Sequence, residues 1–170
     1  LVRYTNVEKK YGVTYWSIGN EPNIFTQMGY ADYDYTIENL NQEWRAIALA
    51  MKEADPTIKL MGPELSQWND SYETTPKDSA GRDWMTEFLK ANGDLVDVVT
   101  VHRYPMYSPN NPVTVQALRE NTQKWLGEVE YLRGLVKEIT GRDLPLAITE
   151  LNSDPSIVQL QDASPDSFYN

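Results

Sequence analysis

Hydrophobic and polar residues follow two different periods along this chain. Four short segments are rich in β-branched and aromatic residues, which is typical of buried strands: 13–18, 57–61, 96–101 and 144–149. Between them, apolar residues recur every three or four positions, the spacing of amphipathic helices, over 35–54, 83–92 and 114–140. The pattern therefore predicts strands and helices in strict alternation.

This alternation predicts the fold class. Strands separated by helices form parallel sheets with helical crossovers, so we expect an α/β domain spanning 1–170. The strand segments are nearly continuous apolar runs, as expected for a sheet covered on both faces. Helix ends are marked by Asp55-Pro56, Asn92-Gly93 and Gly141. Residues 1–12 predict the tail of one more helix, which ends at Gly12.

Polar side chains of chemical interest gather where the predicted strands end. Asn20-Glu21 follows the first strand, His102 and Tyr104 follow the third, and Glu150 and Asn152 follow the fourth. In parallel α/β folds, ligands bind at the carboxyl ends of the strands. The loops at the opposite end carry turn and cap residues. The sequence therefore predicts a site on one rim.

Glu21 and Glu150 form a candidate catalytic pair. Glycoside hydrolysis with retention uses two carboxyl groups roughly 5–5.5 Å apart, one as acid/base and one as nucleophile. One carboxyl group must hold a proton near neutral pH while the other is ionised, so their surroundings must differ. The alternative is that Glu21 is an ordinary solvated acid in a turn.

Other rim residues have competing interpretations. Alone, His102 would be a structural histidine, but its place at a strand end beside Tyr104 favours a substrate-site role. Trp68 could stack on a sugar face, and a loop tryptophan that covers the core is an equal alternative. Glu64 also follows a strand, but its neighbour Pro63 favours a rigid loop over a site role.

Composition excludes several classes of function. The chain has 25 acidic and 15 basic side chains, a net charge of −10, which disfavours binding to nucleic-acid phosphates. It has no cysteine and a single histidine, so thiolate chemistry and cysteine- or histidine-rich metal sites are excluded. No nucleotide-binding glycine motif is present, and no apolar run reaches the roughly 18–20 residues of a membrane span. We expect no metal or cofactor and no membrane partner. The absence of cysteine fits a cytoplasmic bacterial protein and a secreted one equally well.

Three motifs resemble the active-site segments of clan A glycoside hydrolases. Trp16-Ser17-Ile18-Gly19-Asn20-Glu21-Pro22-Asn23 resembles the acid/base segment at the end of barrel strand four. Val101-His102-Arg103-Tyr104-Pro105 is similar to the end of strand six, and Ile148-Thr149-Glu150 to the nucleophile segment of strand seven. The resemblance implies a partial TIM barrel, a (β/α)8 fold represented by about four parallel strands, numbers four to seven.

The resemblance also implies roles for individual residues. Glu21 would be the general acid/base and Glu150 the nucleophile of a retaining enzyme that cleaves β-linked glycosides. Asn20 would bind the 2-hydroxyl of the sugar, and Tyr104 would orient Glu150. The Asn-Glu-Pro-Asn form and Glu150-Leu151-Asn152-Ser153 are similar to families 79, 39 and 44. The implied partner is a carbohydrate.

The resemblance covers only about half of a typical ~250-residue barrel. An open four-stranded sheet exposes two edges and an apolar face. We therefore expect either a fragment of a longer protein, an expectation that the first residue Leu1 supports, or a half-barrel that associates with itself. The alternative function is a non-catalytic half-barrel that binds carbohydrate or self-associates.

Overall fold

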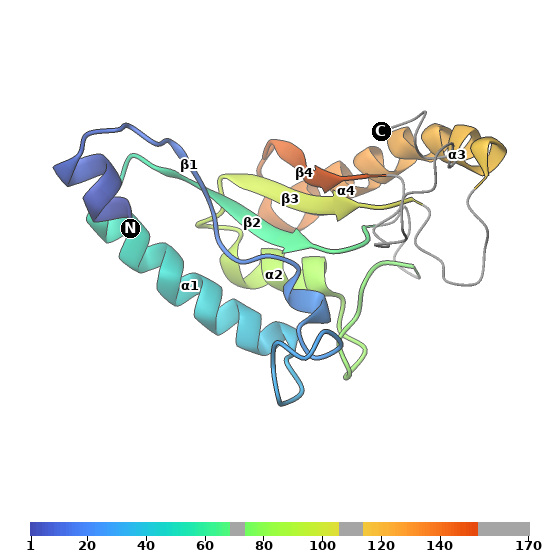
Figure 1. Ribbon diagram of the computed structural model, residues 1–170, viewed down its shortest axis with the longest axis horizontal. Coiled ribbons are helices and arrows are strands. Elements are labelled where there is room, and N and C mark those ends of the chain that lie inside the picture. Colours follow the sequence, from blue (N-terminus) through green and yellow to red (C-terminus); the bar gives the residue numbers. More distant parts are fainter. Residues whose placement is uncertain (69–73, 106–113, 153–170) are drawn as a thin grey trace, which may run out of the picture.

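The computed structural model describes residues 1–68, 74–105 and 114–152. One sheet of four parallel strands runs in chain order, and the arrows of β2, β3 and β4 point to the same end in Figure 1. The strands are β1 (Tyr15–Ser17), β2 (Lys59–Leu65), β3 (Val98–Arg103) and β4 (Leu146–Leu151). The crossovers contain α1 (Ile37–Ala54), α2 (Trp84–Asn92), α3 (Val115–Asn121) and α4 (Trp125–Thr140). This arrangement confirms the expected α/β partial barrel.

Three shorter helical turns complete the described structure. The predicted N-terminal helix tail is a π-helical turn, η1 (Arg3–Glu8), and a 3₁₀ turn, η2 (Pro22–Ile24), follows Glu21. A second 3₁₀ turn, η3 (Thr122–Lys124), separates α3 from α4. In the described residues, no helix is both long and apolar enough to cross a bilayer.

Three of the four strands end later than the sequence pattern predicts, whereas β1 ends one residue earlier, at Ser17. β2 continues through Gly62-Pro63 to Leu65, and β3 and β4 each run two residues past their expected ends. Pro63 lacks an N–H, and the register shifts between Pro63 and Leu65. The Glu64 N–H donates instead to the Thr100 hydroxyl at 3.0 Å. Glu64, His102 and Glu150 therefore lie within strands, where the backbone ladder fixes their positions, whereas Glu21 follows β1.

The single long helix predicted over 114–140 is interrupted. α3 ends at Asn121, and α4 begins at Trp125. Asn121 and Thr122 are weak helix formers, and Arg103 of β3 donates from Nη2 to Asn121 Oδ1 at 2.7 Å. The hydrogen bond thus holds the end of α3, directly before the 3₁₀ turn that the apolar period does not reveal.

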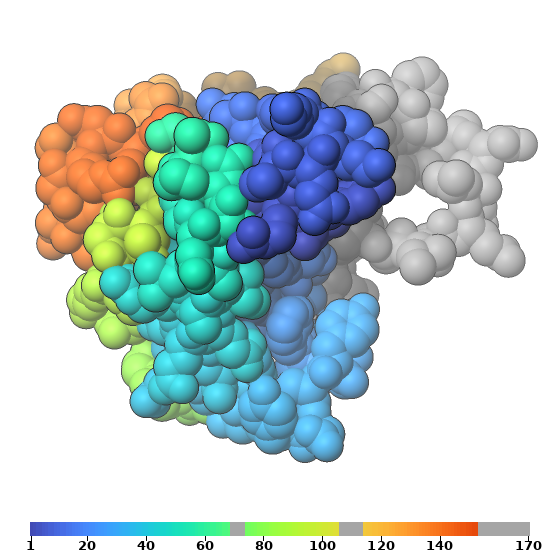
Figure 2. Space-filling view, turned by 90° about the vertical axis from the view of Figure 1, so that its left-hand side faces the viewer, coloured from blue at the N-terminus to red at the C-terminus, as the bar shows by residue number. Residues whose placement is uncertain are grey.

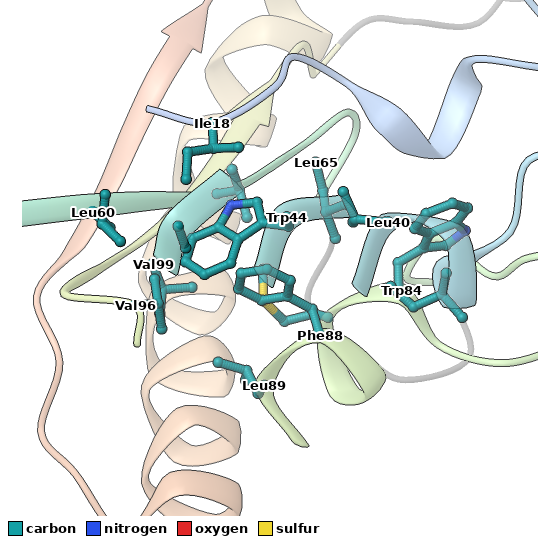
Figure 3. Close-up of a cluster of buried hydrophobic side chains, with 14 of the residues drawn as sticks. Ile18, Leu40, Trp44, Leu60, Leu65, Trp84, Phe88, Leu89, Val96 and Val99 are labelled. Atoms are coloured by element: carbon teal, nitrogen blue, oxygen red, sulfur yellow. The ribbon is translucent and has the colours of Figure 1, made fainter. Parts of the chain in front are cut away.

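The apolar core lies between the sheet and the helices (Figure 3). Trp44 of α1 and Trp84 of α2 are each 1% exposed, as their positions on the apolar stripes predict. Trp44 meets Phe88 edge to face, with ring centroids 5.0 Å apart. Because α2 contacts both α1 and α4, these helices form one layer against the sheet.

The N-terminal residues lie beside α1 (Figure 2). Between them is an apolar cavity of about 530 Å³. Its lining residues include Val2, Trp16, Ile47 and Met51. None of the predicted site residues lines this cavity, so the candidate chemistry lies elsewhere.

Candidate active site

The four strands bring four ionisable side chains to one end of the sheet. Glu21 follows β1, Glu64 lies in β2, His102 in β3 and Glu150 in β4. The Glu21 N–H donates to the Glu64 carbonyl at 2.9 Å, and His102 is the register partner of Glu150. Parallel pairing of neighbouring strands therefore assembles residues that are far apart in the sequence.

His102 lies at the centre of this cluster and is 2% exposed. Its Nδ1 is 2.9 Å from Glu21 Oε1 and 3.5 Å from Glu150 Oε2. Its Nε2 is 3.3 Å from Glu64 Oε2. One imidazole is therefore surrounded by three carboxylates, one on its inner side and two toward the rim.

These surroundings keep His102 protonated at neutral pH. Burial alone would lower the pKa of the imidazole, but the hydrogen bonds to Glu21 and Glu64 and the charge of Glu150 raise it to about 9. Nδ1 then donates to Glu21 and Nε2 donates to Glu64. In return, the hydrogen bond from His102 is the largest influence that lowers the pKa of Glu21, against the effect of its burial.

Glu64 is the member of the cluster that sequence reasoning assigned to a rigid loop and not to the site. It is 3% exposed, and burial would raise its pKa, but hydrogen bonds from His102, Ser17 and Thr149 lower it. Its backbone has φ of 57°, a left-handed conformation that side chains rarely adopt. A carboxylate is rarely buried without partners. The acidic residue Glu64 next to apolar residues was therefore the sequence signal for a buried polar cluster.

Glu150 is the most accessible carboxylate of the cluster. Its side chain is 43% exposed, against 20% for Glu21. The Tyr104 hydroxyl donates to Glu150 Oε1. Burial and this hydrogen bond raise the pKa of Tyr104 to about 12, so its hydroxyl keeps its proton as a donor. Single ligand atoms of Glu21, His102 and Glu150 all lie within 4.8 Å of one another.

Two reciprocal hydrogen bonds fasten the turn that carries Glu21. Asn23 Nδ2 donates to the Ser66 carbonyl at 3.2 Å, and the Ser66 N–H donates to Asn23 Oδ1 at 2.9 Å. Glu21 itself has φ of 49°, in the left-handed region. The end of β2 thus holds Glu21 in a conformation that an isolated turn would disfavour.

The remaining predicted residues are placed differently. Asn20 is exposed beside Glu21, and Asn152 is exposed with its N–H directed to the Arg103 carbonyl at 3.4 Å. Trp68 is 2% exposed and stacks on Tyr131, with centroids 5.7 Å apart. This burial fits the core interpretation of Trp68 and leaves its ring without a free face for a sugar.

The cluster has the residue types of a cation site, but its protonation disfavours one. A metal ion at Glu21, His102 and Glu150 would need a lone pair on His102 Nδ1. With a pKa of about 9, the imidazole carries protons on both nitrogens at neutral pH. The arrangement is suited to proton transfer between carboxylates and an imidazolium.

Comparison with protein families gives one match to nearly the whole chain. The sequence model for "Glycosyl hydrolases family 39" matches residues 3–169. No curated protein matches the chain.

Solved structures of glycoside hydrolases share the fold. A family 44 endoglucanase from Clostridium thermocellum is 19% identical with a TM-score of 0.64, and the match covers 91% of this chain and 40% of that one. A family 44 xyloglucanase from Paenibacillus polymyxa is 17% identical with a TM-score of 0.69, and the match covers 91% of this chain and 39% of that one. A family 39 β-xylosidase from Caulobacter crescentus is 20% identical with a TM-score of 0.57, and the match covers 91% of this chain and 28% of that one. The chain thus spans less than half the length of these structures.

Proposed function

The chain belongs to the glycosyl hydrolases of family 39, and from this premise we propose that its site cleaves β-linked glycosidic bonds with retention of configuration. We further propose that β1 to β4 correspond to barrel strands four to seven and that 1–170 forms part of a catalytic barrel. The observation that carries the proposal is the proximity of Glu21 and Glu150, with single oxygens within 4.8 Å. This separation favours the roughly 5–5.5 Å spacing of retaining enzymes over the roughly 6.5–9.5 Å of inverting ones.

In the first step, Glu21 protonates the oxygen of the leaving group while a Glu150 oxygen attacks the anomeric carbon. The bond to the leaving group breaks and a glycosyl ester with Glu150 forms. In the second step, Glu21 takes a proton from water, which attacks the same carbon and releases Glu150. The exposure of the Glu150 side chain supports its role as the group that meets the sugar.

Two neighbours support this division of roles. The Tyr104 hydroxyl directs a hydrogen bond to Glu150 Oε1, which leaves Oε2 for attack. Asn20 is exposed next to Glu21 and is placed to bind the 2-hydroxyl that the resemblance assigns to it. Because His102 lowers the pKa of Glu21, Glu21 is ionised at neutral pH and must gain a proton before it acts as the general acid.

The nucleophile assignment can be tested by covalent trapping. A 2-deoxy-2-fluoro β-xyloside with a good leaving group should label Glu150 in the longest natural chain that carries these residues, as detected by peptide mass spectrometry. Glu150→Gln is the matched control and should not be labelled. Label on another residue, or an inverted product in the NMR spectrum, would refute the proposal.

A second candidate is a non-catalytic half-barrel that binds carbohydrate or associates with itself. It is favoured by the match to only 40% or less of the related structures. Turnover of an aryl β-xyloside by the 170-residue chain would exclude this candidate. Xyloglucan binding without turnover, or a dimer mass in size-exclusion chromatography, would support it.

A further inference from the structure

Glu64 has no place in the two-step mechanism, yet it is the most deeply buried carboxylate of the cluster. Its side chain is 4% exposed, against 20% for Glu21 and 43% for Glu150. A buried carboxylate loses hydration that only hydrogen bonds can replace. Three side chains supply them, since Ser17, Thr149 and His102 all donate to Glu64. These donors come from β1, β4 and β3, so every strand of the sheet takes part in holding one carboxylate.

The His102 ring bridges Glu64 and Glu21. Nε2 is 3.3 Å from Glu64 Oε2, and Nδ1 is 2.9 Å from Glu21 Oε1. The ring is nearly excluded from solvent at 2% exposure. Any proton that Glu21 gains through this contact therefore comes from Nδ1, and the proton that remains on the ring is the one that faces Glu64.

We propose that Glu64 is a positioning residue that holds the inner side of His102 so that the imidazolium supplies the proton used by Glu21. The Nδ1 proton crosses the hydrogen bond to Glu21 Oε1. The ring becomes neutral with its proton on Nε2, still donated to Glu64, and Glu21 becomes the neutral acid. When Glu21 has passed this proton to the leaving group it is an ionised base again, and the proton that it then takes from water returns to Nδ1. That the proton is used in catalysis rests on the proposed function. That Glu64 positions His102 does not.

The charges around His102 determine whether its pKa rises or falls when Glu64 is replaced. Within the described residues, the ionisable groups paired with it are Glu21 after β1, Glu64 in β2 and Glu150 in β4, and Tyr104 after β3 donates to Glu150. Tyr104 is neutral at working pH, because its pKa is raised to about 12. Removing the negative charge of Glu64 should therefore weaken proton binding by the imidazole.

The direct test is the titration of His102 by ¹⁵N NMR. His102 is the single histidine of the 170 residues. The spectrum is recorded on the longest natural chain that carries them, with a His102→Gln sample to identify its signals. We expect the imidazole to titrate near pH 9 in the wild type. In Glu64→Gln, which keeps an oxygen acceptor for Nε2–H, its pKa should fall by at least about one unit.

Asp97→Asn is the matched control. Asp97 is also a largely buried carboxylate, but it precedes β3 and pairs with Lys52 and Lys59 at the opposite end of the sheet. This variant should leave the His102 titration unchanged. The proposal is overturned if Glu64→Gln does not lower the His102 pKa, or if both variants lower it equally. Should Glu64→Gln fail to fold, the wild type decides, because a ring that is neutral at pH 7 overturns the proposal.

Kinetics separate this inference from the proposed function. In an active enzyme, Glu64→Gln should move the alkaline limb of kcat/KM to lower pH. At a pH above the lowered His102 pKa, it should also slow a glycoside with a poor leaving group up to about tenfold more than a dinitrophenyl glycoside, which needs little acid assistance, because each lost pKa unit removes up to tenfold of the imidazolium. If both substrates are slowed equally and the alkaline limb of kcat/KM does not move, Glu64 has no role in supplying the proton. A chain whose His102 titrates as expected but that cleaves no glycoside would instead refute the proposed function.

Discussion

Two neighbouring residues of β3, His102 and Arg103, each carry a positive charge into a buried cluster, but the clusters differ in their balance of charge. Arg103 donates from Nε to Glu128 and from Nη2 to Asn121, so one cation meets one anion and a neutral amide. His102 meets three carboxylates. Successive strand residues point to opposite faces of a sheet, so the two clusters are separated by the sheet itself.

The difference separates a charge-neutral pair from the cluster that we propose to be catalytic. The Arg103 side chain is 5% exposed and its partner Glu128 6%, and their charges cancel. The pair thereby joins β3 to α4, and Asn121 adds the end of α3. Around His102, the hydrogen bonds and charges of the carboxylates raise the pKa of the imidazole to about 9. The hydrogen bond from His102 in turn lowers the pKa of Glu21. A buried site with unequal charges binds protons tightly enough to store them for a reaction.

The largest expected effect tests the reactive cluster. Glu21→Gln should reduce kcat/KM for a glycoside with a poor leaving group by about 10²–10⁴-fold, because the acid/base is lost. It should lower the free energy of unfolding only modestly, by about 1–2 kcal/mol, because the amide still accepts from His102 and two carboxylates remain beside the imidazolium. Steady-state kinetics and urea denaturation measure the two quantities. If Glu21→Gln instead loses much stability but keeps normal turnover, the His102 cluster is structural and not catalytic.

Glu128→Ala tests the structural pair. Removing one partner leaves the buried Arg103 charge without compensation, which should lower the free energy of unfolding by about 3–5 kcal/mol. The His102 titration should stay unchanged in the folded variant, because the two clusters lie on opposite faces. Urea denaturation and ¹⁵N NMR give the two readouts. An unaltered unfolding midpoint would contradict the structural role assigned to this pair.

The pH dependence of stability should show the His102 cluster directly. The folded-state pKa of about 9 lies above the ordinary value of 6.5, so the stabilising contribution is complete below about pH 6.5 and is lost as pH rises through 9. It should amount to a few kcal/mol. Glu21 and Glu64 have lowered pKa values, so their contribution is lost as pH falls below 4.5. Urea midpoints across pH measure both, and His102→Gln should abolish the alkaline loss.

The smallest effect concerns the helix side of β2. A Cβ on Gly62 would lie 2.7 Å from Trp44 Nε1, so Gly62→Ala should cost about 1–3 kcal/mol through overpacking. Gly134→Ala is the control, because its Cβ would meet nothing within 4 Å on α4 and should stabilise by about 0.4–1 kcal/mol. Thermal melts compare the two. If Gly62→Ala also shifts the His102 titration, packing on one face of the sheet reaches the other.

The sequence alone determined the alternation of elements, because the apolar period distinguishes a strand from an amphipathic helix. It also indicated Glu21, His102, Tyr104 and Glu150, because the carboxyl ends of parallel strands share one rim. It could not place Glu64. Its neighbour Pro63 is typical of a loop, and only the pairing of β2 with β3 shows that the strand continues past it.

Tertiary structure decided what the individual side chains do. From the sequence, Trp68 in its loop fits sugar stacking and core packing equally well. Only its packing against Tyr131 places it in the core. The 3₁₀ turn before α4 directly follows Asn121, which accepts a hydrogen bond from Arg103 of β3. The protonation of His102 depends on carboxylates from three other segments. Local sequence carries the periodicity of single elements, whereas burial and charge arise from contacts between them.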